Sequence, residues 1–116
     1  MQGRQFPLGD SLTSGTPVVG AYRNHLYDLL TTAGYNVDFV GTQTDINNPM
    51  LPDRDHQGMG GYRIDQIQAG LASWLNAIED PDVVLLMIGT NDFYANYYVE
   101  SAPARLASLI ADIATR

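Results

Sequence analysis

The stretch Pro7-Leu8-Gly9-Asp10-Ser11-Leu12-Thr13 decides how the rest of this chain is interpreted. Apolar residues lead into a Gly-Asp-Ser turn, and a segment with helical periodicity follows after a polar loop. This layout predicts that Ser11 lies at the C-terminal end of a first strand, where open α/β sheets bind their ligands. A serine hydroxyl held on such a turn is a candidate nucleophile. Loop serines are more commonly turn or cap residues, so further motifs are needed to choose between these interpretations.

Hydrophobic periodicity divides the chain into alternating strands and helices. Strands are predicted at Gln5 to Leu8, Asn36 to Val40 and Val83 to Ile88. The last of these is apolar without alternation, as expected for a strand covered on both faces. Helical spacing predicts one helix after each strand, at Tyr22 to Ala33, Ile64 to Ile78 and Pro103 to Ile113. This order predicts one α/β domain over residues 1–116, a parallel sheet with helices on both faces.

The segment from Thr42 to Tyr62 is predicted to be a long loop, rich in Asn, Asp, Pro and Gly. Loops of this length are uncommon in compact domains and are often functional. Asp53, Asp55 and His56 lie within it and suggest a metal site as one interpretation. Two carboxylates and one imidazole in a polar loop are more commonly solvated, and no second cluster supports a metal. We therefore expect neither a metal nor a cofactor.

Composition limits the partners that this chain can bind. Thirteen acidic residues against six basic ones give a formal charge of -7, which argues against nucleic acid and anionic membranes as partners. The chain has no cysteine, hence no disulfide framework, and no apolar run as long as a membrane span. Residues Met1 to Arg4 do not begin a signal peptide, because no apolar region follows them. We expect a soluble protein, and secretion of the natural protein remains an open alternative.

Three polar segments end or face the predicted strands: Gly9-Asp10-Ser11, His56 to Arg63, and Gly89-Thr90-Asn91-Asp92. In this order they resemble the motifs of the SGNH (GDSL-type) hydrolases, and the resemblance is closest to the carbohydrate-esterase branch that includes acetyl xylan esterases. Tyr22-Arg23 and Asn36 to Gly41 also resemble this family. The resemblance covers nearly the whole chain. It implies a three-layer α/β/α fold with a flavodoxin-like sheet, strand order 2-1-3 in this portion.

The resemblance also implies a function and a set of site residues. The function is a serine esterase that removes acetyl or similar short acyl groups from a small ester or an acetylated carbohydrate. Ser11 would be the nucleophile, and its backbone N–H, the N–H of Gly61 and the side-chain amide of Asn91 would form an oxyanion hole. Preorganised donors of this kind stabilise the negative charge of a tetrahedral intermediate. A glycine N–H is open to close approach, and an asparagine amide donates at any working pH.

The chain departs from the family in one respect. SGNH hydrolases take their base from an Asp-x-x-His motif near the C-terminus, and no such motif occurs here. We therefore expect an incomplete, N-terminal portion of the domain with weak or no activity, because a serine without a base is a poor nucleophile. His56 is a candidate substitute base, although the family has a histidine in this loop that is not the base, which favours a structural role. His25 lies off its helix's apolar stripe and is expected to be solvated.

Two questions remain open from the sequence. The chain is either a working esterase or a weak or inactive fragment that serves as a flavodoxin-like binding or assembly module. A histidine within hydrogen-bond reach of the Ser11 hydroxyl would favour the enzyme. Tyr94, Tyr97 and Tyr98 either stack on a sugar ring or cover the last helix. The third strand leaves an apolar sheet edge, and such an edge invites pairing, so we expect a homo-oligomer that covers it.

Overall fold

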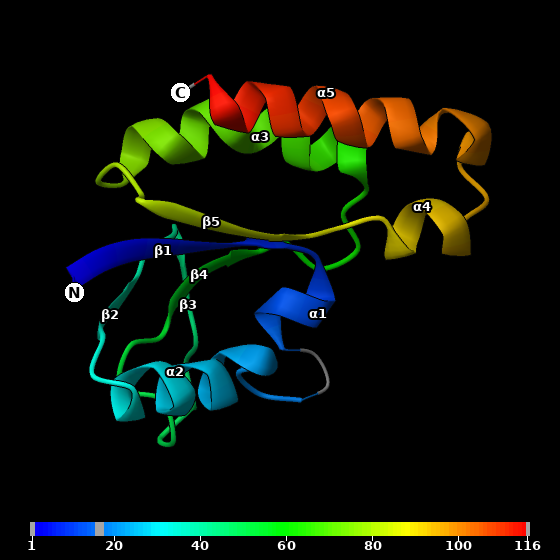
Figure 1. The fold of residues 1–116 in the computed structure, drawn as a ribbon. Helices are drawn as coiled ribbons and strands as arrows, with labels where there is room; N and C mark the ends of the chain where they lie inside the picture. Colours follow the sequence, from blue (N-terminus) through cyan, green and yellow to red (C-terminus); the bar gives the residue numbers. More distant parts are fainter. Residues whose placement is uncertain (1, 16–17, 116) are drawn as a thin grey trace.

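The centre of the sheet is β1 (Gln2–Gly9), with parallel strands on both of its edges (Figure 1). On one edge β1 pairs with β2 (Asn36–Phe39) and then with β4 (Asp55–Gly58). On the other edge it pairs with β5 (Val83–Met87) along the whole of that strand. The path β2-β1-β5 is the predicted strand order 2-1-3. The computed structural model describes residues 2–15 and 18–115.

The prediction of a long loop from Thr42 to Tyr62 is wrong. This segment contains β3 (Gln43–Thr44) and β4, which pair with each other in antiparallel orientation and make the sheet a mixed one. Neither strand shows apolar alternation, because β4 has the sequence Asp-His-Gln-Gly and its buried polar groups are satisfied by hydrogen bonds. The Gln57 side-chain amide, for example, bonds to the backbone N–H and the hydroxyl of Thr42. Hydrophobic periodicity cannot detect such a strand.

Helices cover both faces of the sheet (Figure 1). The helix α2 (Tyr22–Thr32) lies on one face, and α3 (Ile64–Ala77) and α5 (Ala102–Ala114) lie together on the other. The bounds of all three helices agree with the predicted ones to within a few residues. Three shorter helical segments follow strand or helix ends: α1 (Ser11–Ser14), α4 (Thr90–Tyr94) and the 3-10 helix η1 (Val99–Ser101).

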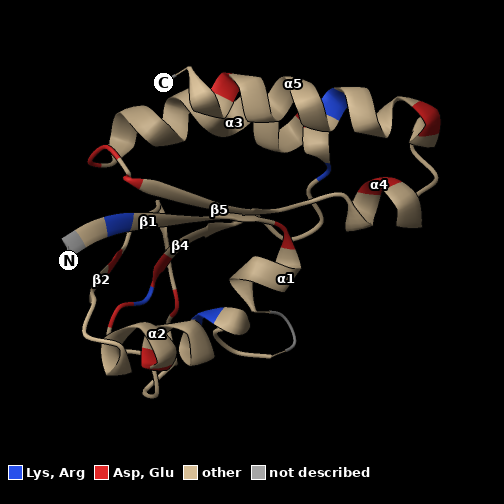
Figure 2. Ribbon diagram, in the orientation of Figure 1, with Lys and Arg blue, Asp and Glu red and all other residues tan. Residues whose placement is uncertain are grey.

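The hydrophobic core lies between the sheet and the pair α3–α5. Its buried members are Phe6, Leu8, Ile64, Ile67, Leu71, Leu75, Ala102 and Leu109. Trp74, on the apolar face of its helix, packs against this core. No helix in the described ranges is both long and apolar enough to cross a membrane. Basic residues are few and are interspersed with acidic ones (Figure 2).

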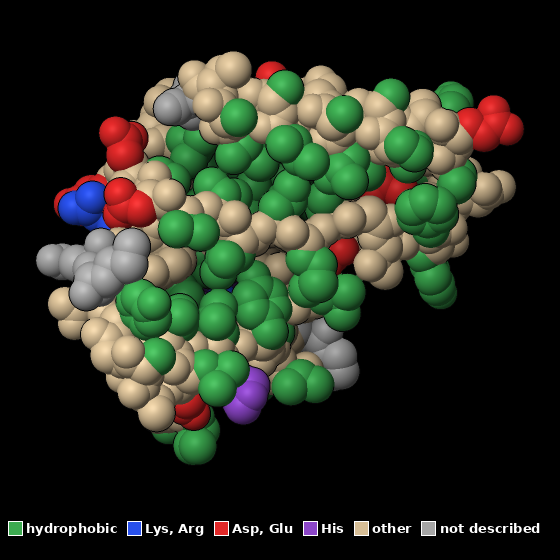
Figure 3. Space-filling view, viewed as in Figure 1, with side chains coloured by type: hydrophobic (Ala, Val, Ile, Leu, Met, Phe, Trp, Pro, Cys, Tyr) green, Lys and Arg blue, Asp and Glu red, His purple; other side chains and the backbone are tan. Residues whose placement is uncertain are grey.

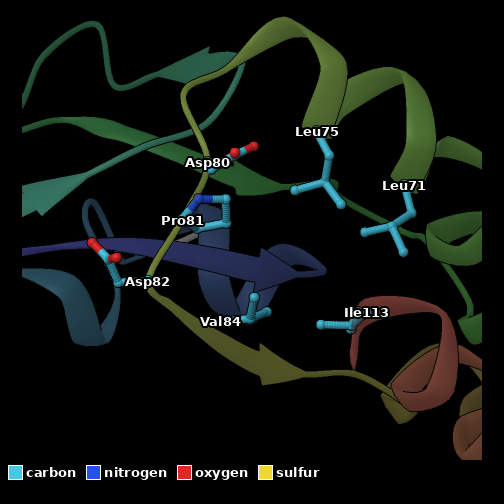
Figure 4. A pocket seen from close by; sticks show the side chains of 7 residues that line it. All are labelled: Leu71, Leu75, Asp80, Pro81, Asp82, Val84 and Ile113. Atoms are coloured by element: carbon cyan, nitrogen blue, oxygen red, sulfur yellow. The ribbon is translucent and has the colours of Figure 1, made fainter. Parts of the chain in front are cut away.

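The strand β5 is not covered on both faces as its apolar sequence predicted. Val83 is 47% exposed and Met87 is 41% exposed, and among the described residues β5 pairs with β1 alone. Hydrophobic side chains gather in a hollow between the two upper helices and β5 and continue toward α2 (Figure 3). A pocket of about 370 Å³ opens there between α3, α5 and Val84, and Leu71, Leu75 and Ile113 line it (Figure 4). Among the described residues, the outer edge of β5 is therefore free, and Val83 and Met87 on this strand are partly exposed.

Candidate active site

The turn after β1 holds Ser11 at the first position of a very short helix. Asp10 caps this helix, because its side chain accepts a hydrogen bond from the Leu12 N–H at 2.9 Å. The backbone carbonyl of Asp10 accepts from the N–H groups of Thr13 and Ser14, each at 3.0 Å. Asp10 is buried, whereas Ser11 is partly exposed. The local sequence therefore fixes the backbone on both sides of Ser11 and leaves its side chain accessible.

The segment α1 packs directly on β4 at Gly58. A β-carbon added at Gly58 would overlap the backbone nitrogen of Ser14, so this position requires glycine. The contact between β4 and α1 is therefore a backbone-to-backbone approach, and it fixes how far Ser11 stands from the loop that follows β4.

We expect Gly58→Ala to lower the free energy of unfolding by about 1–3 kcal/mol, because the added methyl group must push α1 away from β4. Gly60→Ala is the matched control, since no atom lies within 4 Å of its β-carbon position, and it should change stability by less than about 0.5 kcal/mol. Urea denaturation measures both. Equal effects of the two substitutions would contradict the packing described here.

The three predicted site residues, Ser11, Gly61 and Asn91, come together at the C-terminal ends of the strands. The Asn91 side-chain amide donates to the Tyr62 carbonyl at 2.9 Å and lies 3.5 Å from an Asp10 carboxylate oxygen. Asn91 therefore lies between the sequence neighbours of Ser11 and of Gly61. Ser11, Gly61 and Asn91 follow the ends of β1, β4 and β5. These three strands adjoin, because Gly9 of β1 pairs with both β4 and β5.

Two backbone donors beside this asparagine are unused. Within the described ranges the N–H groups of Ser11 and Gly61 donate to no acceptor. Gly61 has φ of +79°, a conformation that favours glycine, and the space at its β-carbon position is empty. One hydrogen of the Asn91 amide is used by the Tyr62 carbonyl, and the other faces Asp10 at the outer limit of a hydrogen bond. The Ser11 and Gly61 N–H groups are therefore free to bind an acceptor, whereas the Asn91 amide can do so by giving up its long contact with Asp10.

Asp92 is a residue of the site region to which the sequence analysis assigned no role. Its carboxylate is fully buried, accepts from the Ile64 N–H at 3.1 Å and forms a short ion pair with Arg105. Asp92 thus joins the start of α3 to α4 and α5, directly beside Asn91. Its position next to Asn91 in the Gly-Thr-Asn-Asp motif was the one sequence signal available.

Arg23 is a second such residue, because in the sequence it stands out only as part of the Tyr22-Arg23 resemblance. It is completely buried, and its guanidinium donates to the Thr13 and Ser14 carbonyls at 3.0 Å each and to the Asp45 carboxylate at 2.9 Å. The carbonyls at the end of a helix have no partners within it. Arg23 supplies those partners for α1 and so supports the turn that carries Ser11.

His56 has a structural role. Its Nδ1 accepts from the Gly58 N–H at 2.9 Å, and its Nε2 lies 3.2 Å from the Asp45 carboxylate. Burial, with the positive charge of Arg23, lowers the pKa of His56 to about 4 despite the opposing effect of Asp45. Burial alone raises the pKa of Asp45, but hydrogen bonds from Arg23 and Asn48 outweigh it and hold that pKa below its usual value.

Neither histidine serves as a base for Ser11 in the described part of the chain. Both ring nitrogens of His56 are already in use, and His25 lies exposed on α2, as predicted. A general base needs a free nitrogen within reach of the hydroxyl proton. The site therefore contains a serine and two unused backbone N–H groups without a histidine partner among the described residues.

We expect the stability of this chain to fall as the pH is lowered from about 6.5 toward 4. The pKa of His56 is 6.5 in its ordinary state and about 4 in the fold, so in this interval the unfolded chain binds a proton that the folded chain does not. The contribution of neutral, buried His56 to the free energy of unfolding is therefore fully present above pH 6.5, and it is lost as the pH falls toward 4. Urea midpoints at pH 7.5, 6 and 5 measure it, with His25→Gln as control. An equally steep decline in His56→Gln would contradict this assignment.

The acidic residues of the former loop are used in structural contacts. Asp53 accepts from the Phe39 N–H at 2.7 Å, and burial raises the pKa of its carboxyl. Asp55 accepts from the Thr44 hydroxyl at 2.7 Å. In residues 2–15 and 18–115, no three His, Cys, Asp or Glu side chains are grouped as metal ligands would be.

Comparison with known proteins identifies the family. The model of the GDSL-like lipase/acylhydrolase family matches residues 8–116. The chain belongs to this family. The GDSL motif of the name corresponds here to Gly9-Asp10-Ser11-Leu12.

Relatives of this GDSL-family chain include esterases. It is 35% identical, over 125 aligned residues, to a multidomain esterase of Ruminococcus flavefaciens, covering 90% of this chain and 16% of that protein. It matches a family 3 carbohydrate esterase of Clostridium thermocellum with a TM-score of 0.85 and 40% identity, over 97% of this chain and 57% of the other. A family 3 carbohydrate esterase of Talaromyces cellulolyticus matches with a TM-score of 0.75 and 26% identity, over 98% and 58%. This chain thus spans little more than half of these solved structures.

Proposed function

We propose that this chain carries the nucleophile and the oxyanion hole of a serine esterase that removes acetyl or similar short acyl groups. The observation that carries the proposal is the group of donors beside Ser11. The unused N–H groups of Ser11 and Gly61 and the Asn91 amide lie in one region, next to an accessible hydroxyl. Such donors are what the oxyanion of ester hydrolysis requires.

The reaction has two steps. The Ser11 oxygen adds to the ester carbonyl carbon, the bond to the alcohol breaks, and the alcohol leaves with a proton. Water then adds to the acyl-serine and releases the carboxylic acid and the serine. In both steps the carbonyl oxygen becomes negative, and the donors of Ser11, Gly61 and Asn91 stabilise it. The serine proton passes to water or to a base that the described residues do not provide, so the chain alone should be slow.

The names of the relatives indicate a carbohydrate as the alcohol part of the ester substrate. The matching solved structures from Clostridium thermocellum and Talaromyces cellulolyticus are named family 3 carbohydrate esterases. We extend this to the present chain and propose an acetylated carbohydrate as its substrate.

The hydrolysis of p-nitrophenyl acetate tests the proposed function. We expect the chain to hydrolyse this ester above the buffer rate and Ser11→Ala to reduce the excess to background. Ser73→Ala, an exposed serine on α3, is the matched control and should keep the wild-type rate. Equal rates for the chain and Ser11→Ala would contradict the proposal.

The second candidate is a binding or assembly module that retains the esterase loops without turnover. The observation that favours it is that His56 is committed to Gly58 and Asp45, which leaves Ser11 without a base among the described residues. The same ester assay decides between the two functions.

We further propose that a second copy of the chain covers the free edge of β5. The exposed Val83 and Met87 and the apolar pocket beside Val84 support this, since an uncovered apolar edge favours strand pairing. Light scattering after size-exclusion chromatography should give a dimer mass, and Val83→Lys should give a monomer. Ile46→Lys, at an 88% exposed position away from β5, is the control. A wild-type monomer at micromolar concentration would contradict the proposal.

A further inference from the structure

The turn that follows α4 has an unusual backbone. Asn96 has φ of +51° and Tyr98 has φ of +43°, both in the left-handed region. Asparagine tolerates this region, whereas a bulky aromatic residue rarely adopts it. Such a conformation costs free energy, and it persists only when the surrounding structure holds it in place.

Neighbouring residues do hold this turn in place. The Arg105 guanidinium donates to the carbonyls of Tyr97 and Tyr98, at 2.9 and 3.0 Å. The Tyr97 N–H donates to the Asp92 carbonyl at 2.8 Å, and the Arg63 guanidinium lies 3.9 Å over the Tyr97 ring. Asp92 adjoins the oxyanion asparagine, and Arg63 lies two residues after the oxyanion glycine. The turn is therefore fixed to both sides of the candidate active site.

The result of this arrangement is an exposed ring on a turn whose backbone is held by hydrogen bonds. Tyr98 is 72% exposed, and the Tyr97 ring supports it edge-on, with the ring centroids 4.9 Å apart. Residues 95–101 line an open depression beside it. With so much of its surface in water, Tyr98 does not serve to cover α5.

We infer that Tyr98 is the platform on which a pyranose ring of an acylated carbohydrate stacks while its ester reaches Ser11. A pyranose ring has an apolar face of C–H groups, which fits the flat face of an exposed tyrosine, and its hydroxyls remain free to bind water or polar neighbours. Asn96 and Glu100 offer polar groups in the same depression. This inference rests on the proposed function, since it names the substrate subsite of that same site.

Calorimetric titration with acetylated xylotetraose tests the inference, in a Ser11→Ala background that prevents turnover. Tyr98→Asn removes the ring and suits the left-handed backbone, so the turn should be retained. We expect this substitution to weaken binding about 3- to 10-fold, the range expected for one aromatic contact. Tyr98→Phe should bind like the parent. Tyr35→Asn, a half-exposed tyrosine just before β2, is the matched control and should leave the affinity unchanged.

Either of two results would overturn the inference. One is equal affinity of the parent, Tyr98→Asn and Tyr35→Asn. The other is the absence of measurable binding by the parent at millimolar sugar. Circular dichroism of Tyr98→Asn shows whether its fold is intact, and the Tyr98→Phe result separates ring loss from turn damage. Because p-nitrophenyl acetate contains no sugar, failure of the proposed function would appear in the ester assay and failure of this subsite only in the titration.

Discussion

Asp92→Ala should lower the free energy of unfolding by about 3–5 kcal/mol, the range for breaking a buried ion pair by removing one partner. The substitution leaves the Arg105 guanidinium without its buried carboxylate and the Ile64 N–H at the start of α3 without its acceptor. Arg105 also holds the turn of Tyr97 and Tyr98. The loss should therefore loosen α3, α5 and the loop beside the active site together.

Urea denaturation measures this loss, and an exposed pair provides the control. Asp38 forms an ion pair with Arg4 at 3.7 Å, but its side chain is 51% exposed, so Asp38→Ala should cost less than about 1 kcal/mol. The double variant Asp92→Ala/Arg105→Met should be more stable than the sum of its single variants predicts, because no unpaired charge remains. Similar losses for Asp92→Ala and Asp38→Ala would contradict the anchoring role of Asp92.

Arg23→Met should cost a similar amount, about 3–5 kcal/mol, for a related reason. Methionine fills part of the same space but leaves the buried Asp45 carboxylate without its arginine partner and the Thr13 and Ser14 carbonyls without donors. Because those carbonyls belong to α1, the turn that holds Ser11 should become less ordered. We therefore expect a loss of ester hydrolysis in addition to the loss of stability.

The control for this substitution is Arg4→Met. The Arg4 side chain is 41% exposed and pairs with Glu79 at 2.7 Å, so its removal should cost less than about 1 kcal/mol. Hydrogen exchange of the amides in α1 adds a local measurement, in which Arg23→Met should exchange faster than Arg4→Met. Unchanged exchange in α1 would contradict the support that we assign to Arg23.

The sequence predicted the elements that hydrophobic periodicity or a turn residue marks. The helices α2, α3 and α5 and the strands β1, β2 and β5 each carry an apolar pattern, and the motif around Ser11 follows β1 as expected. The strand β4 was missed, because its polar side chains are buried in hydrogen bonds and show no apolar period. His56 therefore lies in a strand and not in a loop, where its contacts with Gly58 and Asp45 agree with the structural role that the sequence favoured.

The residues that support the site were harder to predict than those that form it. Ser11, Gly61 and Asn91 lie in short motifs, whereas Arg23, Asp45 and Arg105 act through contacts between segments distant in the chain. A buried arginine resembles a surface arginine in a single sequence, because only the fold supplies its partners. The exposed positions Val83 and Met87 of β5 were not predicted either. An apolar strand sequence predicts burial, whether or not the fold provides an element that covers it.

Covalent labelling with an alkyl fluorophosphonate tests most directly whether Ser11 is an activated nucleophile facing an oxyanion hole. The chain is incubated with the reagent, and the modified residue is identified by peptide mass spectrometry. We predict one adduct on the Ser11 oxygen, with none on Ser14 or Ser73 and none in the Ser11→Ala variant. A chain that hydrolyses p-nitrophenyl acetate but carries its label elsewhere, or a chain that remains unlabelled at Ser11 after prolonged exposure, would contradict the assignment of Ser11 as the nucleophile.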